Sequence, residues 1–470
     1  MKKVFDEVNS LDKRCYEQLN LSEDILMEHA ANAINQFIRS KFSAPANITI
    51  VSGAGNNGAD GIALARQLTG AYNVTLCLPY GTQSAMAIIQ HQRAQLANVT
   101  MTQSLDGLPT DPDIVVDCLF GTGLTRELRP DSQLLIQQLN ALSGYKIACD
   151  IPSGISIDGQ ITTIAFKADI TLTMGALKSA LFSELAKDHI GQISICDLGI
   201  DSSLYQGKTD CYLLEAADLK LPTRMGHNTH KGTYGHVSII IGEKHGAGLL
   251  AAEAAFAFGA GLVTTVSEQQ LATPPHLMNA IAIPNTASAV AIGMGLGDKK
   301  DPQWRQGIKL ILDSATSKVI DADLFYQDLI ITTLKQDNLV LTPHPKEFCA
   351  LLKLCKLAQV STTELQANRF HYVRKFCTKY PSIVLLLKGA NTLIARDKQI
   401  YINPLGTNKL SKGGSGDVLS GLITSLLAQG ELPLGAAINA SLAHALAASG
   451  VAYNNYALSP MDIIEEVKKL

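Results

Sequence analysis

Short hydrophobic runs rich in valine and isoleucine recur through the first half of the chain, and each is followed by a helical pattern of apolar positions. The runs are apolar at consecutive positions, which is typical of parallel strands covered on both faces. They occupy residues 47–53, 73–80, 113–121, 145–154, 169–175 and 192–199. The alternation predicts a doubly wound α/β domain that opens with a long helical hairpin.

The same alternation resumes near residue 236 and continues toward the end of the chain. Apolar runs cover residues 236–242, 262–267, 289–297, 318–324, 338–345 and 382–389. Residues 391–404 have the pattern of a β-hairpin that turns at Asp397 and Lys398. The most apolar stretch, residues 247–263, predicts a buried helix that leads into a strand. A second α/β domain is therefore expected.

A polar stretch without periodicity, residues 219–235, separates the two series of strands and is typical of a linker. We place the first domain at residues 1–212, the linker at 213–228 and the second domain at 229–470. His227 and His230 fall in this stretch, with no cysteine or carboxylate partner close in sequence. They are expected to be solvated rather than to bind a metal.

Length and charge narrow the classes of function. A chain of 470 residues is longer than one hydrophobic core usually serves, which agrees with two domains. The formal net charge of −3 leaves no basic surplus for nucleic acid or an anionic membrane, so small molecules are the expected partners. The nine cysteines are scattered singly and no secretory signal is recognisable, so we expect a reducing, cytoplasmic setting.

The stretch "VSGAGNNGADG" carries a dinucleotide-binding pattern, because Gly53, Gly55 and Gly58 satisfy G-x-G-x-x-G. In nicotinamide-dependent dehydrogenases these glycines cradle a pyrophosphate at a helix N-terminus. Such enzymes also need an acidic residue at the end of the second strand, where it binds the ribose hydroxyls. Residues 76–83 contain no aspartate or glutamate, so a redox role is not indicated.

A second glycine-rich motif, "KGGSGDVLSG", spans residues 412–421. Gly413, Gly414 and Gly416 let backbone N–H groups converge on an anion, and the apolar run that begins at Val418 predicts a helix whose positive end faces it. A phosphate is expected there. Asp417, in the first helical turn, is either a helix cap or a base in a reaction at that phosphate.

Several motifs taken together resemble a known family. The second half contains "HKGTYGHV", "GMGLG", "VIDADL", "TPHPKE" and "GGSGDVLSG", and resembles the ribokinase-like NAD(P)H-hydrate dehydratases that use ADP or ATP. The first half contains "GAGNNGADGIALAR", "DCLFGTGLTRE", "DIPSGISIDG" and "TLTMGALKSAL", and is similar to NAD(P)H-hydrate epimerases. The chain thus resembles the bifunctional NAD(P)H-hydrate repair enzymes. This implies a Rossmann-like first domain and a ribokinase-like second domain, each with an αβα sandwich of three layers.

The resemblance implies the site residues of the first domain. Asp150 would be the acid-base residue, with Lys178 as the alternative, and a potassium ion would be held by Asn57, Asp117 and Ser153 through oxygen atoms. The two aspartates also follow predicted strands, where they could simply cap turns. The glycine-rich turn would grip a phosphate of the substrate. The residues implied to bind the hydrate are Asn56, Asn57, Gly58, Ala59, Asp60, Gly121, Thr122, Gly123, Leu124, Thr125, Arg126, Glu127 and Asp150.

For the second domain the resemblance implies that Asp417 is the catalytic base. A magnesium ion would bridge the nucleotide phosphates, with Glu347 as a further holder. The loop at residues 242–248 is shorter than in the family, and Met294 stands where a proline is usual. The residues implied to bind the hydrate are Ala247, Gly295, His344 and Asp417. Those implied to bind the nucleotide are Lys388, Gly389, Ala390, Asn391, Thr392 and Gly416.

The expected function is therefore repair of hydrated NADH and NADPH. The first domain would interconvert the R and S hydrates, and the second would dehydrate the S form, giving AMP and phosphate if ADP is used. Two alternatives stay open: a vitamin or sugar-alcohol kinase fused to a dinucleotide-binding domain, and a non-catalytic nicotinamide-nucleotide sensor. We expect a homo-oligomer. The sequence does not decide between ADP and ATP, or between NADH hydrate and NADPH hydrate.

Overall fold

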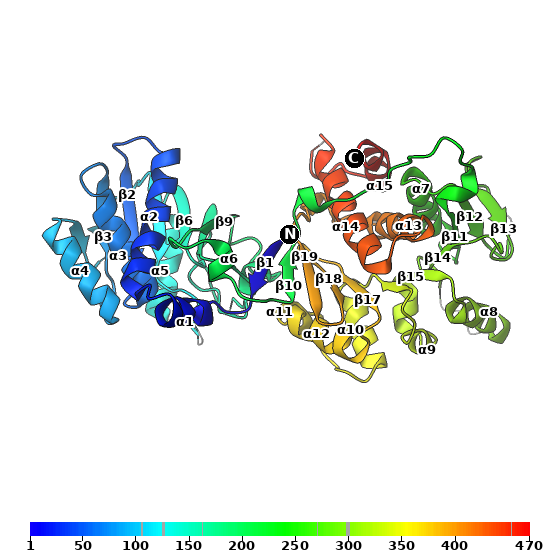
Figure 1. The fold of residues 1–470 in the computed structure, drawn as a ribbon, viewed down its shortest axis with the longest axis horizontal. Coiled ribbons are helices and arrows are strands. Elements are labelled where there is room, and N and C mark those ends of the chain that lie inside the picture. The colour runs from blue at the N-terminus through cyan, green and yellow to red at the C-terminus, as the bar shows by residue number, and fades with distance from the viewer. Residues whose placement is uncertain (105–106, 125–126, 162, 270, 298–300, 453) are drawn as a thin grey trace. The chain divides into compact units, whose positions relative to one another are not determined.

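The computed structural model describes residues 1–104, 107–124, 127–161, 163–269, 271–297, 301–452 and 454–470. The chain divides into two compact units (Figure 1). The N-terminal unit is Lys3–Thr209, and the C-terminal unit is Asp210–Leu470 together with Met1–Lys2. Residues 213–228 belong to the C-terminal unit, because Leu219 and Leu221 pack against its core. Over the described ranges, none of the helices combines the length and apolar character needed to span a bilayer.

A parallel sheet of seven strands forms the centre of the N-terminal unit, as far as that unit is described, in the order β4-β3-β2-β5-β6-β7-β9. All six predicted runs are confirmed as strands of this sheet. The short β4 was not predicted, because only three residues form it. The strands are β2 (Asn47–Ser52), β3 (Asn73–Cys77), β4 (Thr100–Thr102), β5 (Ile114–Cys118), β6 (Tyr145–Cys149), β7 (Ile170–Met174) and β9 (Gln192–Cys196).

Helices cover both faces of this sheet, because successive strand residues point to opposite sides. Ile114 and Val116 of β5 join a core with the helices of one face, whereas Val115 joins a second core with α5 on the other. The first face carries α1 (Asn9–Gln18), α2 (Glu23–Lys41), α3 (Asn56–Leu68) and α4 (Ala85–Leu96), and the second carries α5 (Pro130–Ala141). Outside the sheet lie β8 (Leu177–Lys178), paired with β1 (Lys2–Phe5), and α6 (Ser202–Tyr205). The predicted doubly wound fold with three layers and its opening helical hairpin are confirmed.

The C-terminal unit is built on a mixed sheet in which β11 to β17 run parallel and β18 is antiparallel to both neighbours. The predicted hairpin turns at Asp397, whose φ is 54°. The strand order in this unit is β13-β12-β11-β14-β15-β16-β17-β18-β19-β10. The strands are β10 (Cys211–Leu213), β11 (His236–Ile240), β12 (Leu262–Val266), β13 (Met278–Ala280), β14 (Ala289–Ile292), β15 (Ser317–Ile320), β16 (Leu339–Leu341), β17 (Val384–Leu387), β18 (Thr392–Arg396) and β19 (Gln399–Asn403).

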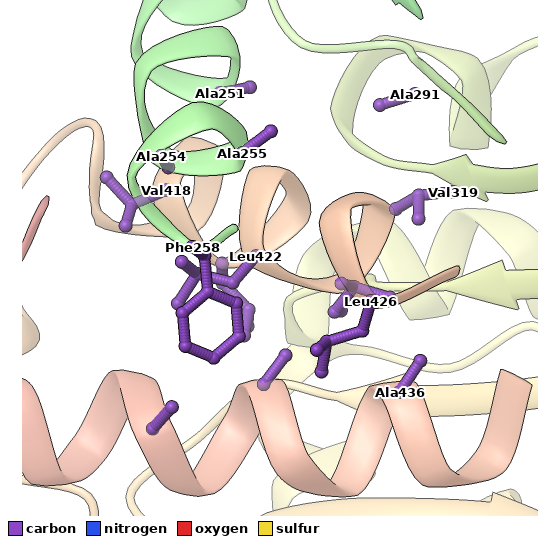
Figure 2. Close-up of a cluster of buried hydrophobic side chains, with 14 of the residues drawn as sticks. Ala251, Ala254, Ala255, Phe258, Ala291, Val319, Val418, Leu422, Leu426 and Ala436 are labelled. Atoms are coloured by element: carbon purple, nitrogen blue, oxygen red, sulfur yellow. The ribbon is translucent and has the colours of Figure 1, made fainter. Parts of the chain in front are cut away.

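Small residues let two helices of this unit approach closely. Figure 2 shows Ala251, Ala254 and Ala255 of α7 (His245–Ala257) against Val418 and Leu422 of α13 (Ser415–Ala428). A Cβ on Gly421 would lie 2.2 Å from the carbonyl oxygen of Ala251. This packing positions the N-terminus of α13. The predicted buried helix leading into a strand is confirmed as α7 and β12.

The remaining helices of the C-terminal unit complete its two outer layers (Figure 1). Beside α7 and α13 lie α14 (Pro433–Gly450) and α15 (Pro460–Glu466). On the opposite side are α8 (Pro302–Asp313), α9 (Ile330–Thr333), α10 (Pro345–Leu354), α11 (Thr362–Ala367) and α12 (Arg369–Lys379). Short 3₁₀ helices occur at Ser179–Phe182 in the N-terminal unit, and in the C-terminal unit at Ala216–Asp218, Lys231–Tyr234, Ala322–Tyr326, Asn408–Leu410 and Val467–Lys469.

Candidate active sites

A cavity of about 700 Å³ opens at the carboxyl ends of the parallel strands in the N-terminal unit. The chain leaves β2 toward β3 on one side of the sheet, and later places β5 on the other side, so the strand order reverses between β2 and β5. Open α/β sheets bind their ligands at such a reversal. The segments that follow β2, β5 and β6 all contribute to the lining.

Most residues implied to bind the hydrate line this cavity: Asn56, Asn57, Asp60, Gly121, Thr122, Gly123, Leu124 and Asp150. Gly58 and Ala59 are buried in the first turns of α3 and are not part of the lining. Glu127 is exposed and does not line it, and Thr125 and Arg126 lie outside the described residues. Asn9 and Asp12 of α1 also line the cavity, although no sequence motif marks them.

The three glycines of G-x-G-x-x-G have different roles. A Cβ on Gly58 would lie 1.8 Å from the Gly53 carbonyl oxygen, and a Cβ on Gly53 would lie 1.9 Å from that of Leu119. These two glycines therefore serve close backbone packing. Gly55, at the N-cap of α3, lines the cavity, and a Cβ there would meet nothing within 4 Å.

Gly58→Ala is expected to destabilise the N-terminal unit by about 3 kcal/mol, the upper end for overpacking, because its methyl group would collide with backbone. For a unit of this size the melting temperature should fall by roughly 6–12 °C. Gly55→Ala is the matched control and should melt close to the unaltered protein. Differential scanning calorimetry of both variants checks this, and equal melting temperatures would contradict the packing role of Gly58.

Asp150 forms a buried ion pair with Lys178. Asp150 follows β6 with a φ of 67°, and its Oδ1 accepts a hydrogen bond from Lys178 Nζ at 2.5 Å and from the Met174 N–H at 3.0 Å. Lys178 is 1% exposed, and its ammonium also donates to Thr173 Oγ1 at 2.9 Å and to the Met174 carbonyl at 3.2 Å. The carboxylate thus lines the cavity while the ammonium lies behind it. This is the geometry of a carboxylate held in place by a buried cation.

Asp117, at the end of β5, is fully buried beside Ser153. Its carboxylate accepts hydrogen bonds from the Ser153 hydroxyl at 2.7 Å, the Ser153 N–H at 2.8 Å and the Leu119 N–H at 3.1 Å. Burial raises the pKa of Asp117 to about 6, although these hydrogen bonds oppose the shift. Asn57 packs against Gly121, and its buried Nδ2 has no hydrogen-bond partner among the described residues.

In the C-terminal unit the glycine-rich motif starts α13 as predicted. Gly414 is the N-cap with a φ of 91°, and no side chain caps the helix. The described residues provide no hydrogen bond to the Asp417 carboxylate, so it does not act as a cap. Burial, and next the charge of Asp321, raise the pKa of Asp417 to about 6, while the Lys388 ammonium opposes this. Asp417 is therefore a partly buried carboxylate suited to accept a proton near neutral pH.

Asp321, the first aspartate of the motif "VIDADL", is a further residue of this site that was not predicted from the sequence. It is 2% exposed and receives hydrogen bonds from Lys388 Nζ at 2.7 Å and from Ser420 Oγ at 2.7 Å. A Cβ on Gly416 would lie 3.2 Å from Lys388 Nζ. Asp321 therefore holds the Lys388 ammonium beside the glycine-rich loop.

Arg369, at the start of α12, supports the loop at residues 388–392. Its guanidinium is buried and donates to the carbonyl oxygens of Leu387, Lys388 and Asn391, each at 3.0 Å. The loop conformation thus depends on a residue far outside the loop. No sequence motif indicates this, since an arginine in a helix is usually a surface residue.

The implied hydrate-binding residues of this unit fall into two groups. Ala247, in the first turn of α7, lies against Gly295, whose Cβ would be 3.3 Å from the Ala247 methyl group. His344 is the N-cap of α10: its Nδ1 accepts from the Lys346 N–H, and its Nε2 lies 3.0 Å from Glu347 Oε1. Glu347 also accepts from the His344 N–H. His344 and Glu347 are therefore joined by two hydrogen-bonding contacts.

A separate cavity of about 800 Å³ lies between the carboxyl ends of β11 and β12 and helix α8. Its lining mixes apolar side chains, among them Ile241, Val266 and Trp304, with polar ones such as Glu243 and Asp301. None of the residues implied to bind hydrate or nucleotide lines it.

Comparison with known proteins gives the same division of the chain. The family described as NAD(P)H-hydrate dehydratase matches residues 237–469, and the one described as YjeF-related protein N-terminus matches residues 23–180. The bifunctional NAD(P)H-hydrate repair enzyme of Helicobacter pylori is 44% identical over 479 aligned residues that cover 100% of both chains. That of Coxiella burnetii is 34% identical and covers 95% of this chain and 94% of its own.

Among solved structures, an ADP/ATP-dependent NAD(P)H-hydrate dehydratase from Bacillus subtilis, co-crystallised with ATP/Mg²⁺, is similar to the C-terminal part. It is 27% identical and covers 53% of this chain and 92% of its own, with a TM-score of 0.44. These two repair enzymes are more than 30% identical to the chain, and each alignment covers at least 94% of both proteins. The chain belongs to the family of bifunctional NAD(P)H-hydrate repair enzymes.

Proposed function

We propose that the cavity of the N-terminal unit epimerises the hydrates of NADH and NADPH, and that the Asp417 site of the C-terminal unit dehydrates the S hydrate with ADP or ATP. NAD(P)H-hydrate repair by these two activities is the function of the family. We assign the two activities to these sites because each unit presents one carboxylate suited to act as a base. Asp150 is held by a buried lysine at a cavity, and Asp417 stands free beside Lys388.

In the epimerase, the hydrated carbon must change configuration, which needs proton transfer at its hydroxyl group. Asp150 lines the cavity and is the base in our assignment. Lys178 is buried and engaged by acceptors, so it orients Asp150 rather than reacting itself. General acid-base catalysis of this kind contributes roughly 10²- to 10⁴-fold to the rate.

In the dehydratase, the hydroxyl group of the S hydrate attacks the terminal phosphoryl group of the nucleotide, and Asp417 takes the hydroxyl proton. Phosphate then leaves as its bond to the ring carbon breaks, and the neighbouring ring carbon gives up a proton to solvent as the ring double bond forms, which completes the loss of water; with ADP the products are NAD(P)H, AMP and phosphate. The Gly413–Gly416 backbone amides and the Lys388 ammonium would stabilise the transferred charge. Asp321 and Arg369 hold Lys388 and its loop in place for this.

Magnesium is part of the proposal for this site, because the Bacillus subtilis relative was crystallised with ATP/Mg²⁺. Mg²⁺ binds mainly through phosphates and water, so one or two carboxylates from the protein are enough. The charges of Asp321, Glu347 and Asp323 act on the Asp417 carboxylate, and this acidic surrounding supports the proposal. When bound, Mg²⁺ would neutralise charge on the nucleotide phosphates.

Potassium is our proposal for the site of Asn57, Asp117 and Ser153. These side chains offer the oxygen ligands that a hard cation needs. Among the described residues, no cationic side chain hydrogen-bonds to the buried Asp117 carboxylate. This fits a bound cation, which would supply positive charge near the substrate.

Asn57→Ala is expected to slow epimerisation and to weaken its dependence on potassium, while dehydration of pure S hydrate stays intact. We prefer it to Asp117→Ala, which would leave three buried hydrogen-bond donors without an acceptor. Each such donor lowers the free energy of unfolding by about 1–3 kcal/mol, so that variant would also lose stability. The measurement is the epimerisation rate across a KCl titration at constant ionic strength. Equal loss of both activities in a folded variant would contradict separate sites.

The proposed function is tested by incubating the full chain with mixed R and S hydrates of NADH and with ADP. We expect NADH absorbance to recover completely, faster than spontaneous epimerisation allows. Omitting ADP should abolish recovery and leave only the interconversion of epimers. Phosphorylation of a vitamin or sugar alcohol without NADH recovery would instead identify a kinase, and binding without turnover would identify a sensor.

A further inference from the structure

Asp12 is a carboxyl group of the N-terminal cavity that the assignment above does not use. It lies on α1 and lines the cavity together with Asp60 and Asp150. The residues matched to the family begin at residue 23, so α1 lies outside them. The cavity therefore receives a titratable group from the opening helix.

The tyrosine that hydrogen-bonds to Asp12 packs against the same turn that holds Lys178, the partner of Asp150. The Tyr205 hydroxyl donates a hydrogen bond of 2.7 Å to Asp12 Oδ1, and Tyr205 is 2% exposed. The tyrosine ring lies against Gly175, where a Cβ would come within 2.5 Å of it. Gly175 follows Met174, whose carbonyl accepts from Lys178 Nζ. One turn thus supports both Tyr205 and the Lys178–Asp150 pair.

The three carboxyl groups of the cavity differ in their partners. Lys178 forms its ion pair with Asp150. Burial raises the pKa of Asp12 and of Asp60, and the charge of Asp150 raises both further. The charged and titratable groups that act on Asp12 are Glu7, Cys15, Tyr16, Asp60, Asp150, Lys178 and Tyr205. Asp150, paired with the Lys178 ammonium, is thus placed to act as a base, and Asp12, hydrogen-bonded to the neutral Tyr205 hydroxyl, is a second carboxyl group at the same cavity.

We propose that Asp12 is the general acid of epimerisation, acting opposite Asp150; this rests on the proposed epimerase function. Asp150 removes the hydroxyl proton at the hydrated carbon, a carbonyl forms as the bond from carbon to the ring nitrogen breaks, and that nitrogen receives the proton of Asp12. Rotation about the adjacent carbon–carbon bond presents the other face. Reclosure returns one proton to the oxygen from Asp150 and one to Asp12 from the nitrogen, so no co-reactant is consumed.

Asp12→Asn keeps the side chain's size and its acceptor for Tyr205 but removes the acid. The enzyme-catalysed excess over spontaneous epimerisation is expected to fall about a hundredfold or more. Glu17→Gln, an exposed carboxylate on the same helix, is the matched control and should change nothing. Dehydration of pure S hydrate and the melting temperature should be unaltered in both.

The pH profile separates an acid from a merely structural group. The acid must be protonated, so kcat/KM of the unaltered protein should fall as pH rises through the pKa of Asp12, and Asp12→Asn should lack this alkaline fall. Tyr205→Phe removes a hydrogen bond that favours the charged carboxylate, so the fall should move to higher pH. This second variant still tests the proposal if Asp12→Asn does not fold.

Two results would overturn the inference. One is an Asp12→Asn protein whose excess rate is within a few-fold of normal; if Asp60→Asn is then inactive, Asp60 is the acid instead. The other is an alkaline fall that Tyr205→Phe leaves in place. If the unaltered protein gives no excess epimerisation at all, the proposed epimerase function fails, which is a distinguishable outcome.

Discussion

Replacing Asp417 by asparagine is expected to reduce nucleotide-dependent dehydration by about a hundredfold or more, while ADP binding changes little. Asparagine keeps the size of the side chain but cannot accept the hydroxyl proton. The described residues offer the carboxylate no capping hydrogen bond, so α13 should form normally. The checks are single-turnover dehydration of S hydrate, ADP titration and thermal unfolding. Asp337→Asn, an exposed aspartate in the same unit, is the control and should behave normally.

The pH dependence of this reaction follows from the raised pKa of Asp417, about 6. Because the base works deprotonated, dehydration should rise with pH through about 6 and then level off, and Asp417→Asn should lose this rise. The contribution of Asp417 to folding stability changes with pH in the opposite direction. The folded state binds the Asp417 proton more tightly than the unfolded state, so this group's contribution to stability falls as pH rises from about 4 to about 6.

Asp417→Asn should therefore melt at the same temperature or slightly higher at pH 7. A large drop in melting temperature would contradict this and favour a structural role in α13. Unchanged turnover would refute proton transfer to Asp417, whatever the stability.

Asp150→Asn is expected to reduce the catalysed excess of epimerisation by roughly 10²- to 10⁴-fold. Unlike the Asp417 variant, it should also be less stable, because it leaves the buried Lys178 ammonium without its carboxylate. Breaking a buried ion pair typically costs about 3–5 kcal/mol. The measurement is the approach of R hydrate to epimeric equilibrium, compared with the spontaneous rate. Asp158→Asn, on an exposed aspartate a few residues further along the chain, is the control.

A double variant separates catalysis from stability at this pair. Asp150→Asn with Lys178→Met removes both charges, so it should regain most of the lost stability and none of the lost epimerisation. An Asp150→Asn protein that keeps the full excess rate would move the acid-base role to Lys178. Dehydration of pure S hydrate should be normal in every variant of this pair.

The strand runs were predictable because burial on both faces leaves a local signal. Each strand of a covered parallel sheet is apolar at consecutive positions, and the intervening helices are amphipathic. The strands that escaped prediction, such as β4, β10 and β13, are three residues long and carry no such run. Residues 213–228 read as a linker because they lack periodicity, yet Leu219 and Leu221 pack against the C-terminal core.

By itself the sequence determined the two α/β units, the family, and the chemical motifs at strand ends and helix starts, since each depends on residues adjacent in the chain. Only the tertiary structure showed which residues hold the site residues in place. Lys178 pairs with Asp150, Asp321 holds Lys388, Arg369 clamps the 388–392 loop, and Tyr205 fixes Asp12. The partners in these contacts are far apart in the sequence: Arg369 and Leu387 are separated by 18 positions, and Tyr205 and Asp12 by 193. The pattern along the chain does not record them, because such partners meet only when separate strands and helices pack around a common site.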